Sequence, residues 1–209
     1  MTTSALRIVS ILSLAMALAA CGSSPPATPD SGIALQDSGD GRACPLPEGT
    51  EANPIGTSLN RTLRAFTLNR CDGTPYEFYG EAEGFCEASF TVITLAAGWC
   101  VPCQMEAALL QSNVADAYAD RDVRVVQVML QNPDGTAATP AFCQDWVDTY
   151  DLRFPEVLDP DGTTWIFAPD NALPATVIVD SAGVIRYREY GTTANLSSLT
   201  AALDRLLAE

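Results

Sequence analysis

The pair Cys100 and Cys103 constrains this chain more than any other feature of its sequence. The mostly apolar stretch Phe90–Ala97 predicts a buried strand just before the pair, and Gln104–Leu110, directly after it, are good helix formers. Cysteines three positions apart at the start of a helix lie on one face of its first turn. The free N–H groups and the positive dipole end at that position stabilise a thiolate, the form that attacks disulfides.

This position predicts a redox pair in which Cys100 attacks and Cys103 resolves the mixed disulfide. Two other interpretations exist for such a pair: half of a zinc site, or a structural disulfide in a redox-inactive binding module. A zinc site needs two further ligands, but the chain has no histidine and its other cysteines are scattered singly. We therefore expect no metal and no cofactor.

The charge of the chain limits its partners. The 209 residues are enough for one domain with appendages, and the formal net charge is −15, with Asp and Glu spread along the sequence. Such a surface argues against a nucleic-acid partner and against docking on anionic lipid through charge. Seven cysteines fit an oxidising compartment.

Residues 1–20 have the pattern of an export signal. Arg7 supplies the positive start, and the apolar run 8–20 is too short to span a bilayer as a helix. Leu18–Cys21 resembles the bacterial lipobox, which implies that 1–20 is a lipoprotein signal peptide and that Cys21 carries the lipid anchor. An ordinary secretory signal with a chance cysteine is the alternative. The anchor would place the protein in the cell envelope, facing the periplasm, and Gly22 favours the outer membrane if the cell is Gram-negative.

Composition divides the rest of the chain at about residue 53. Residues 21–52 are rich in Ser, Pro, Gly and Asp and predict a flexible tether, and 53–209 predict one folded domain. The expected strands are Leu63–Leu68, Tyr76–Tyr79, Phe90–Ala97, Val123–Leu130, Pro155–Leu158, Ala175–Asp180 and Val184–Tyr190. The expected helices are Cys100 to about Ala119, Pro140–Tyr150 with Thr139 as N-cap, and Asn195–Leu207. This order predicts an α/β fold with a mixed central sheet flanked by helices and an N-terminal β-hairpin extension.

Four motifs together resemble the TlpA/ResA branch of thioredoxin-fold proteins. The motifs are Phe66–Leu68 followed by Asp72–Gly73, then Trp99–Glu106, Leu173–Thr176 and Asp180–Gly183. Members of this branch are exported, membrane-tethered thiol–disulfide oxidoreductases within the redoxin superfamily. The resemblance implies a thioredoxin-like fold for 53–209, protein thiols and disulfides as substrates, and a membrane thiol donor.

The resemblance also implies roles for two residues outside the cysteine pair. Pro174 matches a proline that follows a cis peptide bond and faces the disulfide; the alternative is a trans proline at the start of a strand. Glu106 matches a glutamate that assists proton transfer; the alternative is a solvated first-turn glutamate favoured by the helix dipole. Thr94 stands where many thioredoxins have a buried aspartate, which leaves Glu106 as the base.

Four further cysteines allow three pairings: Cys44, Cys71, Cys86 and Cys143. The two arms of the hairpin that turns at Asp72–Gly73 bring Cys71 and Cys86 together, so we predict a Cys71–Cys86 disulfide. By elimination Cys44 then pairs with Cys143. Free buried cysteines are the alternative.

The direction of electron flow is predicted from the neighbours of the pair. Val101 and Pro102 carry no charge, and the chain is acidic, so the thiolate is less stabilised than in strong oxidants. We therefore predict a reductase of disulfides in exported proteins. The alternative is a peroxiredoxin-like thiol peroxidase, whose Pro-x-x-x-Thr/Ser-x-x-Cys frame does not precede Cys100. A copper-delivery protein of this fold would need a histidine.

Overall fold

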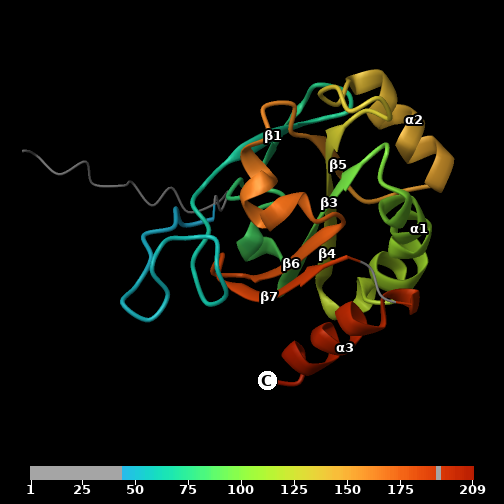
Figure 1. Cartoon of the computed structure of the whole chain (residues 1–209). Coiled ribbons are helices and arrows are strands. Elements are labelled where there is room, and N and C mark those ends of the chain that lie inside the picture. Colours follow the sequence, from blue (N-terminus) through green and yellow to red (C-terminus); the bar gives the residue numbers. More distant parts are fainter. Residues whose placement is uncertain (1–43, 192–193) are drawn as a thin grey trace, which may run out of the picture. The chain divides into compact units, whose positions relative to one another are not determined.

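A computed structural model describes residues 44–191 and 194–209, so the predicted signal peptide, the lipidation site Cys21 and residues 22–43 of the predicted tether lie outside it. Its strands are β1 (Thr67–Arg70), β2 (Pro75–Glu77), β3 (Phe90–Ala97), β4 (Val123–Gln131), β5 (Glu156–Leu158), β6 (Ala175–Asp180) and β7 (Ile185–Tyr190). The main helices are α1 (Val101–Leu110), α2 (Pro140–Tyr150) and α3 (Ser197–Leu206) (Figure 1). Shorter helical turns are η1 (Phe85–Glu87), η2 (Gln111–Asp116), η3 (Ala119–Arg121), η4 (Thr163–Phe167), η5 (Pro169–Asn171) and η6 (Ala194–Leu196).

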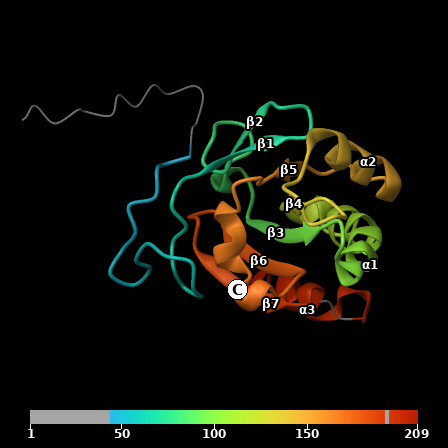
Figure 2. The same ribbon diagram turned by 45° about the horizontal axis from the view of Figure 1, so that its top comes forward.

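All seven strands form one mixed sheet in the order β2-β1-β5-β4-β3-β6-β7. β3 runs parallel to β4, and β4 runs parallel to β5, whereas the pairs β3–β6, β6–β7, β1–β5 and β1–β2 are antiparallel. The α/β fold with a mixed sheet is confirmed. The predicted N-terminal hairpin exists as β1 and β2, and it extends the main sheet through β5 (Figure 2).

The central strand β3 divides the core into two layers. Its side chains alternate between the two faces, as the pleat of a strand requires. Ile93 and Leu95 pack against an aromatic group from the N-terminal part, which is Phe66, Tyr76, Phe78, Tyr79 and Phe85. On the other face Val92 packs with α3 and the end of the first helical segment, and Ala96 packs beneath α2. The strand is therefore covered on both sides, as its apolar sequence predicts.

The folded part begins earlier than the composition indicates. Residues 44–52 belong to the predicted tether, but Cys44 is buried and forms a disulfide with Cys86 in η1. This bond fixes the segment to the aromatic layer of the core. The disulfide therefore ties the predicted tether 21–52 to the folded domain at Cys44.

The predicted disulfide pairing is also wrong, because it rested on the hairpin alone. Cys71 follows β1, which pairs with β5, and its Sγ lies 3.9 Å from the carbonyl oxygen of Glu156. α2 covers this edge of the sheet, so Cys71 bonds to Cys143 on that helix. Cys86 lies in the other layer of the core, where it meets Cys44. The hairpin therefore does not bring Cys71 and Cys86 together.

Two helix limits follow the local chemistry of the chain. Thr139 caps α2 as predicted, since its Oγ1 accepts a hydrogen bond of 3.3 Å from the backbone N–H of Phe142. The α-helical part of the first helix is shorter than expected, because α1 ends at Leu110. The π-helical segment η2 follows directly. The chain then reverses near Asp122, which has a φ of 56°. These changes leave the start of α1, and thus the cysteine pair, in its predicted place.

Candidate redox site

The strand β3 delivers Cys100 to the start of α1. Cys100 is the N-cap residue of that helix, and its Sγ accepts a hydrogen bond of 3.2 Å from the N–H of Cys103. The two cysteines are joined in a disulfide with a Cα–Cα distance of 5.2 Å. Cys103 is fully buried and Cys100 is nearly so. Donation from a helix N-terminal N–H to Sγ favours a thiolate at Cys100 once the disulfide is reduced.

The alternative of a zinc half-site finds no further ligands in the structure. No group of three His, Cys, Asp or Glu side chains that could hold a metal ion occurs within residues 44–191 and 194–209. The pair is instead joined covalently, and the other described cysteines are joined to one another.

The turn between β3 and the pair is held by β4. Gly98 donates its N–H to the carbonyl of Gln131 at 2.8 Å, and Trp99 donates Nε1–H to Oε1 of the same glutamine at 2.8 Å. Gln104 on α1 donates to the carbonyl of Gly98 at 2.8 Å. A Cβ atom at Gly98 would lie 2.6 Å from the ring of Phe142 on α2, so only glycine fits here. α2 therefore packs directly against the turn that presents Cys100.

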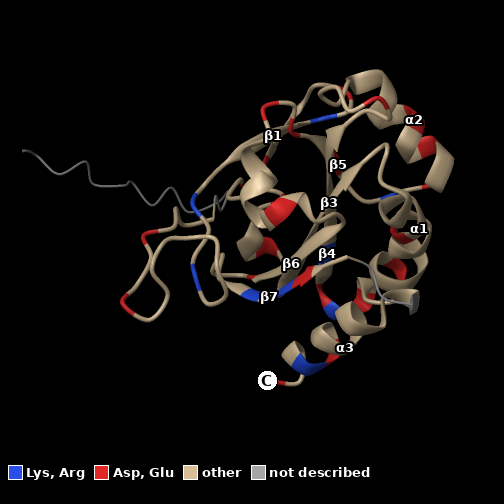
Figure 3. Cartoon of the chain, in the orientation of Figure 1, with Lys and Arg blue, Asp and Glu red and all other residues tan. Residues whose placement is uncertain are grey.

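The segment that contains the pair, Trp99–Met105, is uncharged and exposes apolar side chains. Trp99, Val101 and Met105 are 44%, 60% and 55% exposed. No residue from Trp99 to Met105 carries a charge, whereas acidic residues occur along α2 and α3 (Figure 3). A partner that approaches Cys100 therefore meets hydrophobic side chains first.

Pro174 directly precedes β6, the neighbour of β3 in the sheet. The Leu173–Pro174 peptide bond is cis, as the family resemblance implied, and Pro174 is buried. Leu173 packs on the cluster of buried residues that contains Cys100 and Cys103. Leu173, which shares the cis bond with Pro174, thus reaches the cluster that contains the predicted pair.

Glu106 is buried, so the alternative of a solvated first-turn glutamate is wrong. Its side chain is 3% exposed, and its Oε1 accepts a hydrogen bond of 2.7 Å from Oγ1 of Thr94 on β3. Thr176 on β6 donates in turn to Oγ1 of Thr94 at 3.2 Å. Cys103 and Glu106 lie three positions apart on the buried side of α1. A carboxyl group is therefore placed one turn beyond the buried cysteine.

Glu156 is a buried acid that sequence reasoning missed. It lies on β5, and neither of its carboxyl oxygens has a hydrogen-bond partner within the described residues. Burial raises the pKa of Glu156 well above its ordinary value. The sequence signal was a single acid within the otherwise apolar strand Pro155–Leu158, which a burial argument could have flagged. Its position two strands away from β3 separates it from the cysteine pair.

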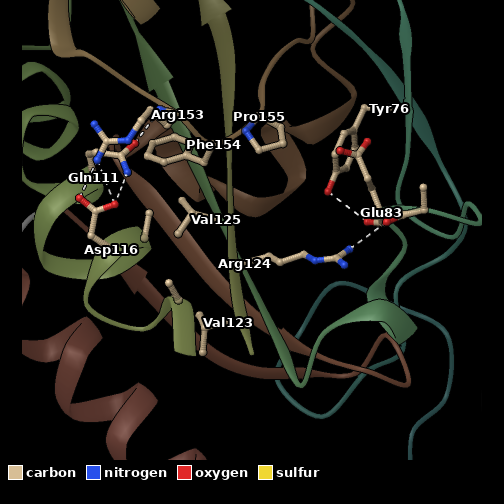
Figure 4. A pocket seen from close by; sticks show the side chains of 13 residues that line it. Tyr76, Glu83, Gln111, Asp116, Val123, Arg124, Val125, Arg153, Phe154 and Pro155 are labelled. Atoms are coloured by element: carbon tan, nitrogen blue, oxygen red, sulfur yellow. Dashed lines mark hydrogen bonds and ion pairs between the residues drawn. The ribbon is translucent and has the colours of Figure 1, made fainter. Parts of the chain in front are cut away.

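A groove of about 520 Å³ lies at the far end of the sheet from Cys100. It runs beside the first residues of β4, between η2 and the loop after β2, and Figure 4 shows the side chains that line it. Its polar groups are already engaged: Arg153 forms an ion pair with Asp116 at 2.7 Å, and Gln111 donates to Asp116 at 2.8 Å. Nothing in the sequence predicted this groove.

Comparisons with known proteins agree with this geometry. A curated relative, the thioredoxin-like protein YneN of Bacillus subtilis (strain 168), is 33% identical over 98 residues, which are 46% of this chain and 53% of YneN. The match thus spans about half the length of that relative. The structure of a secreted Mycobacterium tuberculosis disulfide oxidoreductase homologous to Escherichia coli DsbE is 25% identical, with a TM-score of 0.52 over 67% of this chain and 95% of that one. StoA from Bacillus subtilis, 20% identical, shares the fold with a TM-score of 0.52 over 72% of this chain and 99% of its own.

Fold and site together define the class: thiol–disulfide oxidoreductases with a thioredoxin-like fold and a Cys-x-x-Cys pair at a helix N-terminus. Within that fold, the chain belongs to the AhpC/TSA family, whose model matches residues 59–188.

Proposed function

We propose that this protein is a lipid-anchored reductase of disulfides in exported proteins, kept reduced by a membrane thiol donor. The observation that carries the proposal is the Cys100–Cys103 disulfide at the N-terminus of α1, with Leu173 of the cis Leu173–Pro174 bond packed on the same cluster. The helix N-terminus favours the attacking thiolate, and the apolar surface around it suits unfolded or extended protein segments rather than small charged thiols.

The reaction begins with the reduced pair. The Cys100 thiolate attacks one sulfur of a substrate disulfide; the substrate S–S bond breaks, and one substrate cysteine leaves as a thiolate that takes up a proton. Cys103 then loses its proton, and its sulfur attacks Sγ of Cys100. The second substrate cysteine leaves and is protonated in turn. Two electrons pass from the protein to the substrate, and the Cys100–Cys103 disulfide remains for the membrane donor to reduce.

Glu106 is the base in this proposal. Cys103 is fully buried, so bulk water cannot take its proton directly, and the carboxyl one turn further along α1 is the group placed to accept it. Thr94 stands where many thioredoxins have a buried aspartate. Threonine has no carboxyl group, and its hydroxyl instead donates a hydrogen bond to Glu106.

Cys21 supplies the proposed anchor. The lipobox-like sequence Leu18–Cys21 supports lipidation and a place in the cell envelope, facing the periplasm. The helices of residues 44–191 and 194–209 include none with the length and apolar character needed to cross a membrane. The mature protein should partition into detergent, and Cys21→Ser should release it or stall its processing. Mass spectrometry that finds an unmodified Cys21 on the intact mature chain would exclude the anchor.

A peroxidase is the second candidate, favoured by the match to the AhpC/TSA family model. A peroxidatic frame ending at Cys100 would need Pro and Thr or Ser where this chain has Ile93 and Ala97. We therefore expect peroxide consumption to be slow and disulfide reduction to be fast.

Trapping tests the proposal directly. A Cys103→Ala variant cannot resolve the mixed disulfide, so it should retain envelope proteins covalently at Cys100, while the matched Cys100→Ala variant should retain none. Partners identified by mass spectrometry would name the substrates. Equal, near-zero capture by both variants, with rapid peroxide turnover by the wild-type protein, would favour the peroxidase instead.

A further inference from the structure

We propose that Thr94 and Thr176 are positioning residues that hold the Glu106 carboxyl through two hydroxyl groups linked in series by hydrogen bonds. This inference rests on the proposed function, since it concerns the base of the same reaction. It assigns to β3 and β6 a role that the cysteine motif does not reveal.

The sheet register brings the two threonines together. Thr94 and Thr176 are directly opposite each other in the antiparallel pair β3–β6, so their side chains lie on the same face of the sheet. Both side chains are buried, at 0% and 3% exposure, and their hydroxyl oxygens are 3.2 Å apart. α1 covers this face and places the carboxyl of Glu106 2.7 Å from Thr94.

The number of hydroxyl hydrogens determines which threonine donates in each hydrogen bond. A threonine hydroxyl has one hydrogen to donate. The Thr176 hydroxyl donates a hydrogen bond to Oγ1 of Thr94, and the Thr94 hydroxyl donates its hydrogen to Oε1 of Glu106. A hydrogen bond donated to a carboxyl oxygen favours the ionised form over the same carboxyl without that donor, so removing the hydroxyl of Thr94 should disfavour the carboxylate of Glu106.

Among the described residues, the groups facing Glu106 come from its own helix and from the strands beneath it. Cys103 lies on its own helix, and the neighbours of Thr94 and Thr176 on this face of β3 and β6 are the apolar Val92, Ala96 and Ile178. The same register row continues to Gln127 on β4, whose Oε1 accepts from Trp146 at 2.8 Å. On either side, the same row includes Glu156 on β5 and Glu189 on β7. The carboxyl of Glu189 accepts hydrogen bonds from the hydroxyls of Tyr187 and Ser198.

The strand offers a matched control. Thr91 also lies on β3 and is 1% exposed, but its Oγ1 has no hydrogen-bond partner within the described residues. Being three positions from Thr94, it points to the opposite face of the strand. Thr91→Val therefore removes a buried hydroxyl from the same element without touching Glu106.

The experiment titrates the Glu106 carboxyl by ¹³C NMR of glutamate-labelled full-length protein, with Glu106→Gln to assign the signal. In Thr94→Val the midpoint should move to higher pH by about one unit, which corresponds to about 1.4 kcal/mol. Thr176→Val should shift it in the same direction by less. Thr94→Ser, which restores the hydroxyl, and Thr91→Val should both titrate like the wild-type protein.

The pH profile of disulfide reduction by the same variants should follow these midpoints. An unchanged Glu106 midpoint in Thr94→Val, or an equal shift in Thr91→Val, would overturn the inference. A wild-type protein that fails to reduce disulfides while the Glu106 midpoints shift as expected would contradict the proposed function and leave the positioning role standing.

Discussion

Cys71 at the end of β1 is bonded to Cys143 on α2, across a sequence separation of 72. The bond joins the N-terminal hairpin to the helix whose Phe142 packs against Gly98 in the turn before Cys100. Because a long closed loop restricts the unfolded chain, removing this disulfide by Cys71→Ser with Cys143→Ser should lower the free energy of unfolding by about 2–4 kcal/mol.

Denaturant unfolding of the double variant measures that loss. The matched control is Cys44→Ser with Cys86→Ser, which opens a shorter loop with a separation of 42 and leaves α2 attached. We expect the first variant, and not the second, to change the rate at which Cys100 reacts. Peptide mapping without reduction checks the connectivity: a Cys71–Cys86 peptide would contradict it.

Glu156 makes the stability of the fold depend on pH. Burial raises the pKa of Glu156, so the folded protein holds this proton at pH values where the unfolded chain, with an ordinary value near 4.5, has lost it. The contribution to stability is therefore greatest below about pH 4.5 and falls as the pH rises towards the folded-state value. Glu156→Gln removes this dependence and should raise the free energy of unfolding at pH 7.5 by about 1–3 kcal/mol.

Urea unfolding at pH 5 and pH 7.5 distinguishes a pH-dependent change in the free energy of unfolding from one that is the same at every pH. The exposed Glu81 provides the control, and Glu81→Gln should change little at either pH. If Glu156→Gln were destabilising at pH 7.5, the carboxylate would have to be making favourable interactions, and the account of an unpaired buried acid would fail.

Gly98 should tolerate no side chain. A methyl group there would collide with Phe142 and with Pro133, whose backbone N would be 2.7 Å away. Gly98→Ala should therefore cost about 1–3 kcal/mol of stability and slow disulfide reduction, because the turn that presents Cys100 must shift. Adding Phe142→Leu should recover part of both losses; a fully active, fully stable Gly98→Ala variant would show that the turn is not fixed by this contact.

Local sequence patterns predicted most of the helices and strands. The features that depend on pairing between distant residues were not predicted. The apolar run Phe90–Ala97 and the Thr139 cap follow from neighbouring residues, and both appear as predicted. The pairing of β1 with β5 depends on residues far apart in sequence, so no local pattern revealed that Cys71 would meet Cys143. Composition likewise could not show that Cys44 is buried.

The candidate site divides in the same way. The spacing of Cys100 and Cys103 identified the redox pair, and the family resemblance indicated the cis bond before Pro174. The hydrogen bonds from Thr176 to Thr94 and on to Glu106 depend on the register between β3 and β6, which could not be predicted from the sequence. Glu156 had a local signal, a single acid in the apolar strand Pro155–Leu158, but its lack of a hydrogen-bond partner within the described residues depends on long-range packing.

The reduction potential of the Cys100–Cys103 pair tests the central claim most directly. A helix N-terminus stabilises the thiolate by about 1 kcal/mol at an uncharged site, and Val101 and Pro102 add no charge between the cysteines. Equilibration of the protein with glutathione buffers, followed by alkylation and mass measurement of this pair, should give a midpoint near the roughly −270 mV of thioredoxin. A midpoint near the roughly −120 mV of strong oxidants would contradict the reductase and make this protein a donor of disulfides instead.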